Sequence, residues 1–138
     1  MEILIYTDGA SRGNPGPSAS GYEIFAGAKQ ISHAFFNGAK TNNEAEYIAI
    51  IAALKRVGEE FGYANTVSVH SDSELVIRQL SGKYKVKSSQ LSTLHSEALS
   101  LLCKFAGYKL TNLRREHVRI ASVDKALNVL LDQRDKST

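Results

Sequence analysis

Segments typical of strands and of helices follow one another in a distinctive order along this chain, and that order limits the folds open to it. Short apolar runs bounded by Gly, Asn or Asp are typical of strands, and longer runs with a helical apolar stripe are typical of amphipathic helices. We expect strands at residues 2–7, 21–25, 30–36, 66–71 and 108–113, and helices at residues 42–61, 73–80, 89–105 and 121–133.

This order predicts an α/β fold built on a mixed sheet. The second and third strands are joined by a turn around Gly27, so we expect an antiparallel hairpin there. The later strands alternate with helices, which favours parallel pairing and places helices on both faces of the sheet. Residues 10–20 are rich in Gly, Pro, Ser and Asn and are expected to form a loop. Either Thr41 or Asn42 is expected to cap the first helix.

Length and composition limit the organisation of the protein and the kinds of partner it has. A chain of 138 residues suits one domain, residues 1–138, with one core. The net charge of +3 permits a polyanionic partner without demonstrating one. The single cysteine, Cys103, excludes an intramolecular disulfide, and its apolar neighbours predict a buried thiol. We see no leader, no segment of membrane-spanning length and no sign of a protein partner, so we expect a cytoplasmic monomer without membrane contact.

Two aspartates follow apolar strands. Asp8 comes after the run at residues 3–7, and Asp72 comes after the run at residues 67–71. If these strands are parallel neighbours, both carboxylates emerge at the same edge of the sheet, where open α/β sheets place their ligand sites. Taken singly, each residue is equally well explained as an ordinary turn aspartate.

Two further acids lie in the first turns of predicted helices. At about 100° per residue, Glu46 shares its helix face with Ile50 and Val57, so it points toward the core and needs a partner there. Asp124 lies on the same side of the last helix as Leu127. For both acids the alternative is a carboxylate that stabilises a helix N-terminus.

Convergence of these four acids would make sense only around cations. Carboxylates gathered at one site repel one another, raise one another's pKa and destabilise the empty protein. A pair of divalent cations reverses that effect, because a two-metal site needs shared carboxylates. Ligands that are all oxygen suit Mg²⁺, with Mn²⁺ able to substitute, better than Zn²⁺. If the four acids converge, the sequence therefore predicts two Mg²⁺ ions per site.

Four segments carry a resemblance to a known family. Residues 7–16 read TDGASRGNPG, residues 41–46 read TNNEAE, residues 71–73 read SDS and residues 123–128 read VDKALN. Together they resemble the type 1 ribonuclease H family over nearly the whole chain. The resemblance implies a five-stranded sheet in the order 3-2-1-4-5. It also implies an endonuclease that hydrolyses the RNA strand of RNA–DNA hybrids by two-metal-ion catalysis, leaving 5′-phosphate and 3′-hydroxyl ends.

The resemblance also assigns roles to individual residues. It implies that the metals are held by catalytic acids at the four motif positions, which are Asp8, Glu46, Asp72 and Asp124. It implies that the hybrid is gripped by backbone near Gly9 and by the asparagines of two motifs, which are Asn14, Asn42 and Asn43. Such contacts can engage the 2′-hydroxyl or read the minor groove without base specificity. For Asn42 and Asn43, helix capping is the alternative.

The sequence departs from the common bacterial pattern in two places. Many members carry a catalytic histidine on a loop before the last acid, whereas here the spacing puts Arg114 at that place and His117 nearer to Asp124. His117 is thus either a catalytic auxiliary or an exposed loop histidine. Arg115 belongs to a basic cluster from which we expect phosphate contacts. The chain also lacks the basic, tryptophan-bearing protrusion of many bacterial members, so it resembles the archaeal-like subgroup.

Two other functions are compatible with part of this pattern. One is another nuclease or integrase of the same fold superfamily, although the asparagine motif and the Gly-Asn-Pro-Gly motif belong to the ribonuclease H branch. The other is a non-catalytic module that binds hybrids, although acids are intact at all four motif positions.

Overall fold

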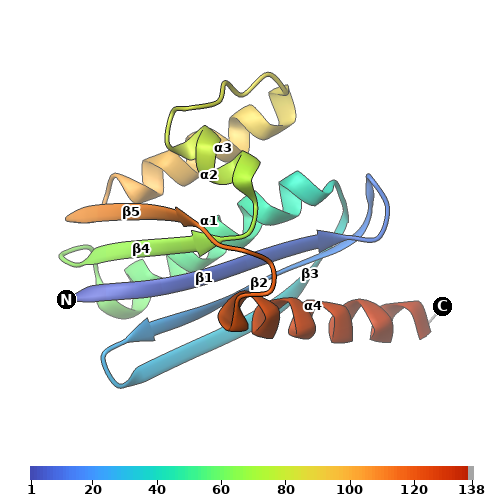
Figure 1. The fold of residues 1–138 in the computed structure, drawn as a ribbon, viewed down its shortest axis with the longest axis horizontal. Helices are drawn as coiled ribbons and strands as arrows, with labels where there is room; N and C mark the ends of the chain where they lie inside the picture. Colours follow the sequence, from blue (N-terminus) through green and yellow to red (C-terminus); the bar gives the residue numbers. More distant parts are fainter. Residues whose placement is uncertain (137–138) are drawn as a thin grey trace.

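Five strands form one mixed sheet in the computed structural model, which describes residues 1–136 (Figure 1). The order is β3-β2-β1-β4-β5, as the resemblance implies. The first three strands pair antiparallel, whereas β4 and β5 run parallel to β1. Their bounds are β1 Glu2–Ser11, β2 Gly16–Ala26, β3 Lys29–Lys40, β4 Thr66–Ser71 and β5 Gly107–Asn112.

Helices cover both faces of this sheet, which confirms the predicted fold class (Figure 1). One face carries α1 and α3, and α4 crosses the other face over β1, β2 and β3. The four helices within the described residues are α1 Asn42–Phe61, α2 Glu74–Leu80, α3 Ser89–Leu102 and α4 Val118–Lys136. Among the residues described, no helix combines the length and the apolar character needed to cross a membrane.

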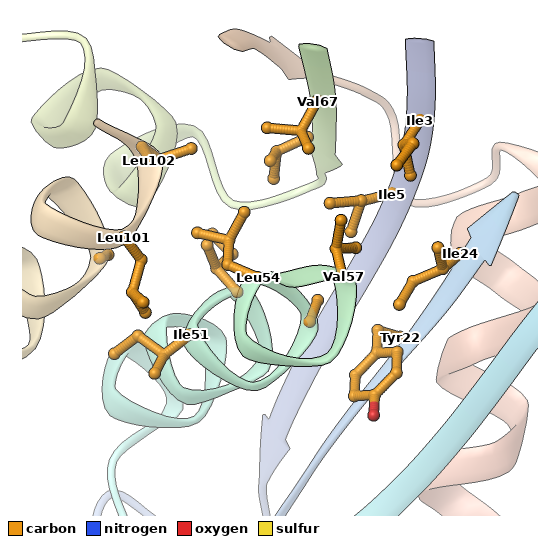
Figure 2. Close-up of a cluster of buried hydrophobic side chains, with 14 of the residues drawn as sticks. Ile3, Ile5, Tyr22, Ile24, Ile51, Leu54, Val57, Val67, Leu101 and Leu102 are labelled. Atoms are coloured by element: carbon orange, nitrogen blue, oxygen red, sulfur yellow. The ribbon is translucent and has the colours of Figure 1, made fainter. Parts of the chain in front are cut away.

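The main core lies between the sheet and α1. Alternate residues of the strands, such as Ile5 and Ile24, point to one face and are fully buried there against Leu54 and Val57 of α1 (Figure 2). A smaller cluster on the opposite face packs α4 against the sheet through residues that include Leu127. The buried stripe of α1 extends back to the first turn of the helix. The N-terminal residues of α1 therefore lie at the edge of the sheet.

The expected loop at residues 10–20 is wrong over most of its length. Only residues 12–15 lie outside strands, because β1 continues to Ser11 and β2 begins at Gly16. Small residues fit here because the sheet is closely covered on both faces. Ser20, for example, is buried and donates its hydroxyl to the Ala45 carbonyl oxygen of α1 at 2.6 Å. The polar composition reflects a crowded, hydrogen-bonded strand segment, not a solvated loop.

Smaller differences concern the ends of two helices. Helix α3 ends at Leu102, so Cys103 lies at its C-cap and is exposed, contrary to the buried thiol we expected. Helix α4 begins at Val118, three residues before the predicted start. At the start of α1 the structure decides between the two candidate caps. Thr41 forms a capping box with Glu44, which leaves the Asn42 side chain available for other contacts.

Candidate active site

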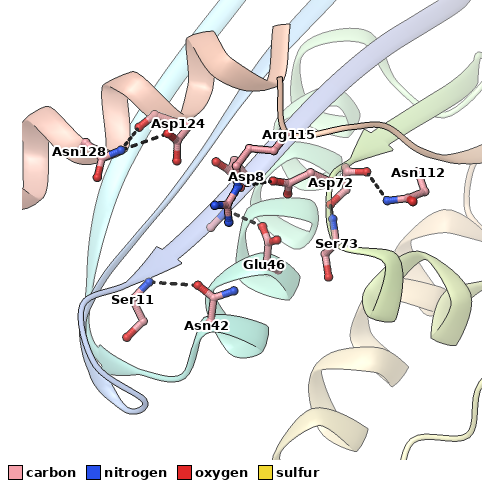
Figure 3. Close-up of polar contacts among 12 residues, drawn as sticks. Asp8, Ser11, Asn42, Glu46, Asp72, Ser73, Asn112, Arg115, Asp124 and Asn128 are labelled. Carbon is pink, nitrogen blue, oxygen red and sulfur yellow. Dashed lines mark hydrogen bonds and ion pairs between the residues drawn. The ribbon is translucent and has the colours of Figure 1, made fainter. Parts of the chain in front are cut away.

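Two aspartates meet where the parallel pair β1–β4 ends. The last paired residues are Thr7 of β1 and Ser71 of β4, so Asp8 and Asp72 follow at the same level on neighbouring strands. Strand β1 continues past Asp8 to pair with β2, whereas the chain leaves the sheet after Ser71. The two carboxylates therefore emerge side by side at the predicted edge (Figure 3).

Glu46 reaches the same place from the first turn of α1. Its Oε1 accepts a hydrogen bond from the backbone N–H of Gly9 at 2.5 Å, and the residue is only 5% exposed. This contact requires close packing between α1 and β1. A Cβ atom on Gly9 would lie 2.3 Å from the Ala45 carbonyl carbon, so only glycine fits at this position.

The three carboxylates fit a divalent cation. One oxygen from each of Asp8, Glu46 and Asp72 lies within 4.8 Å of the others. Oδ1 of Asp72 is buried and has no hydrogen-bond partner in the part of the chain that the structure describes. A buried carboxylate oxygen without a donor is costly, and a hard cation among three such groups would satisfy it.

Burial and the negative charges around them make Asp8 and Glu46 hard to ionise without a cation. Burial raises the pKa of Asp8 from 3.8 to about 8, with further contributions from the negative charge of Asp72 and from contact with Asp124. The pKa of Glu46 is also raised, first by burial and then by the charges of Asp8 and Asp72. The Gly9 N–H opposes this shift only in part.

The raised pKa of Asp8 predicts how stability depends on pH in the absence of metal. Folded protein holds this proton up to about pH 8, whereas the unfolded chain releases it near pH 4, so stability falls as pH rises through that window. In chelator we expect a lower melting temperature at pH 8 than at pH 5, measured by circular dichroism. Added Mg²⁺ should stabilise the protein more at pH 8, because protons compete with the metal.

Two variants control this measurement. Asp8→Asn should flatten the decline between pH 5 and pH 8, whereas Glu59→Gln, which removes an exposed carboxylate on α1, should leave the decline as in the wild type. A wild-type melting temperature that rises over this window in chelator would contradict the electrostatic description of the cluster.

The fourth predicted acid, Asp124, approaches from α4. It is close enough to Asp8 to raise the pKa of that residue, but it lies outside the group of three. Its Oδ2 accepts a hydrogen bond from the Asn128 side chain one turn later at 3.1 Å (Figure 3). The structure thus brings all four motif acids to one edge of the sheet, three in a tight cluster and one beside it.

The loop between β5 and α4 brings an arginine to the acids. Nε of Arg115 lies 3.6 Å from Oδ2 of Asp72, and the arginine side chain is 80% exposed (Figure 3). The His117 ring instead stacks on Tyr6, with 6.0 Å between centroids, and its Nδ1 accepts the Arg119 N–H. His117, Arg114 and other residues of this loop line a pocket of about 590 Å³.

Two of the predicted hybrid-binding asparagines join the loop after β1 to the start of α1. Oδ1 of Asn42 accepts the Ser11 N–H at 3.3 Å (Figure 3). Oδ1 of Asn14 accepts the Asn42 N–H at 3.3 Å. Both contacts are exposed. Asn43 is half-buried in the same helical turn. The Gly9 N–H already donates a hydrogen bond to Glu46. In this structure Gly9 therefore serves to allow the close packing of α1 on β1.

Sequence reasoning missed two asparagines that support the acids. Asn112 ends β5 and donates from its side chain to the Ser71 carbonyl oxygen at 3.1 Å, next to Asp72. Its place at the carboxyl end of a parallel strand was the available signal. Asn128 was detectable from its spacing, because residues four apart in a helix are neighbours and Asp124 is four positions earlier.

A sequence model of the RNase H family matches residues 1–124. The chain belongs to the RNase H family. Ribonuclease HI of Halobacterium salinarum is 38% identical over 115 residues, which make up 82% of this chain but 57% of that protein. The bifunctional protein Rv2228c of Mycobacterium tuberculosis is 38% identical over 113 residues, 76% of this chain and 29% of its own. This RNase H chain therefore spans only part of the length of these relatives.

Solved structures agree with this membership. The crystal structure of RNase H1 from Halobacterium salinarum superposes with a TM-score of 0.87 at 34% identity, covering 96% of this RNase H chain and 99% of that chain. A crystal structure of LC11-RNase H1 in complex with RNA/DNA hybrid gives 0.86 at 34% identity, covering 95% and 97% of the two chains. The resemblance to the type 1 family is confirmed.

Proposed function

We propose that this protein is a metal-dependent endonuclease that hydrolyses the RNA strand of RNA–DNA hybrids. The observation that carries the proposal is the cluster of Asp8, Glu46 and Asp72, three carboxylates from three elements within 4.8 Å of one another. Membership of the RNase H family supports it, as does the likeness to LC11-RNase H1, whose structure contains an RNA/DNA hybrid.

The acids would serve to hold two Mg²⁺ ions, with Asp124 completing the ligand set. Bound divalent cations would activate a water molecule and stabilise negative charge on the scissile phosphate. In the proposed reaction water attacks phosphorus in line, the bond to the 3′ oxygen breaks, and a proton passes to that oxygen. The products carry 5′-phosphate and 3′-hydroxyl ends. In the metal-free protein the raised pKa values of Asp8 and Glu46 oppose the binding of cations, because protonated acids bind cations poorly.

Contacts beside the acids would select the substrate. Asn14 and Asn42 are linked to each other on the exposed side of α1, where their remaining polar atoms can meet a minor groove and the 2′-hydroxyl groups. On the other side of the acids, Arg115 is exposed and would reach a phosphate. We assign His117 no step, since its ring lies on Tyr6.

A cleavage assay tests the proposal. Labelled RNA–DNA, RNA–RNA and DNA–DNA duplexes of one sequence are incubated with the protein in Mg²⁺, in Mn²⁺ or in chelator, and the product ends are mapped. We expect cleavage of the RNA strand in the hybrid, in either metal and not in chelator. Hybrid that is bound equally well with chelator and never cut would identify a binding module and overturn the enzymatic proposal.

Removal of Arg115 should weaken binding through loss of one phosphate contact. For Arg115→Ala we expect the slope of log affinity against log salt to fall by about one, with weaker binding to every hybrid sequence. Binding is measured by fluorescence anisotropy in chelator. Arg56→Ala is the matched control, because it removes the same charge near the far end of α1, where Arg56 pairs with Glu60. Equal slopes for both variants would exclude Arg115 from the phosphate contacts.

A further inference from the structure

A second buried carboxylate lies outside the acid cluster, on the face of β2 beneath α4. Glu23 is 8% exposed, and its neighbours Tyr22 and Ile24 point to the opposite face, into the core under α1. Oε2 of Glu23 accepts a hydrogen bond from the hydroxyl of Ser122 in α4 at 2.6 Å. The two residues are 99 positions apart, so this contact ties the helix to the sheet.

The other oxygen of Glu23 shows that this burial is costly. Oε1 is buried and finds no hydrogen-bond donor among the described residues. Glu23 lines a pocket of about 250 Å³ together with Ser32 of β3 and Val123 of α4. A buried carboxylate with a hydrogen bond to only one of its oxygens makes the protein less stable than an apolar residue of the same shape would. The single strong contact of Glu23 is its hydrogen bond to Ser122, and this contact indicates what Glu23 holds in place.

Ser122 precedes Asp124 by two residues in the early turns of α4. Apolar contacts such as those of Val123 and Leu127 press the helix onto the sheet, but apolar contacts are non-directional. A short hydrogen bond to a carboxylate is directional and stronger than a neutral one. It fixes the rotation and the height of this helical turn relative to β2, which pairs with the strand that carries Asp8.

We infer that Glu23 is a positioning residue, which holds Ser122 so that the carboxylate of Asp124 is set against the Asp8–Glu46–Asp72 cluster. This rests on the proposed function, because it assigns Asp124 to the metal ligands. In this assignment Glu23 acts through its hydrogen bond to the hydroxyl of Ser122, and not by contact with substrate or metal.

The test compares truncated and conservative variants of the pair. Glu23→Ala and Ser122→Ala should each lower kcat about tenfold, because a small misplacement of one ligand is enough for that loss, and KM for the hybrid should not change. Glu23→Gln keeps the acceptor oxygen and Ser122→Thr keeps the hydroxyl, so each of these variants should retain the kcat of the wild type. The double alanine variant should be no worse than either single variant. Ser32→Ala, on the same pocket, is the control.

Binding of Mn²⁺ gives a readout independent of turnover. By calorimetry without substrate, the alanine variants should bind Mn²⁺ several-fold more weakly than wild type, and Glu23→Gln should not. A purely structural role would instead lower the melting temperature of the alanine variants while leaving kcat and Mn²⁺ affinity intact, and that result would overturn the inference.

Asp124→Asn distinguishes failure of the positioning role of Glu23 from failure of the proposed function. If Asp124→Asn binds Mn²⁺ and cleaves like wild type, Asp124 is not a ligand and the positioning role falls with it. If Asp124→Asn is impaired while Glu23→Ala and Ser122→Ala are not, the ligand assignment stands and Glu23 does not position it. Impairment of all three variants, with rescue by Glu23→Gln, supports the inference.

Discussion

Asp8→Asn is expected to abolish hybrid cleavage and, in chelator, to make the protein more stable. An amide cannot replace a carboxylate as a shared metal ligand, so activity should fall by at least about a thousandfold, equivalent to several kcal/mol of lost transition-state stabilisation. The same change removes the buried charge that raises the pKa of Glu46. At pH 8 without metal we expect the melting temperature to rise by about 5 °C.

These opposite effects distinguish a metal ligand from a structural aspartate. A structural aspartate lost from the end of a strand would lower both activity and stability. Glu59→Gln, which removes an exposed carboxylate elsewhere, should change neither. Full activity of Asp8→Asn in Mg²⁺ would refute the role assigned to Asp8, and lower stability in chelator would refute the repulsion among the acids.

Gly9→Ala is expected to be the most destabilising substitution near the site. The added Cβ would lie 2.3 Å from the Ala45 carbonyl carbon and 2.5 Å from the Glu46 backbone nitrogen, and backbone atoms cannot turn aside as a side chain can. Helix α1 must therefore move away from β1. We expect a loss of more than about 3 kcal/mol in the free energy of unfolding, measured by urea titration.

Gly107→Ala provides the matched control. Its added Cβ would meet the Thr66 side chain at 3.5 Å, an ordinary contact, so we expect a change below about 1 kcal/mol. Any Gly9→Ala protein that folds should also have lost cleavage, because displacement of α1 carries Glu46 away from Asp8. Equal stability of the two glycine variants would show that the close approach of α1 to β1 is not needed.

The order of elements was predictable because it depends on local patterns that packing did not override. Alternation of strands with helices gave the mixed sheet, and the apolar face shared by Glu46 and Ile50 gave the inward direction of that glutamate. Parallel pairing then brought Asp8 beside Asp72. Each of these steps needs only the periodicity of one segment and the rule that parallel strands end at one edge.

The remaining features depend on contacts between distant segments. The composition of residues 16–20 predicts a loop, because small polar residues are typical of loops. In the structure Ser20 instead donates a hydrogen bond to Ala45 across the sheet–helix interface. Motif spacing could not show that Arg115 lies beside Asp72 while His117 turns toward Tyr6, since a loop conformation decides it. Glu23 gave no local signal, because its partner is 99 positions away.

The most direct test is an anomalous difference map from crystals of the protein grown with Mn²⁺. We expect Mn²⁺ peaks bounded by the carboxylates of Asp8, Glu46 and Asp72, and their loss in crystals of Asp8→Asn grown in the same way. Ordered carboxylates with no peak between them at saturating Mn²⁺ would contradict the metal site, and with it the proposed hydrolysis of RNA–DNA hybrids.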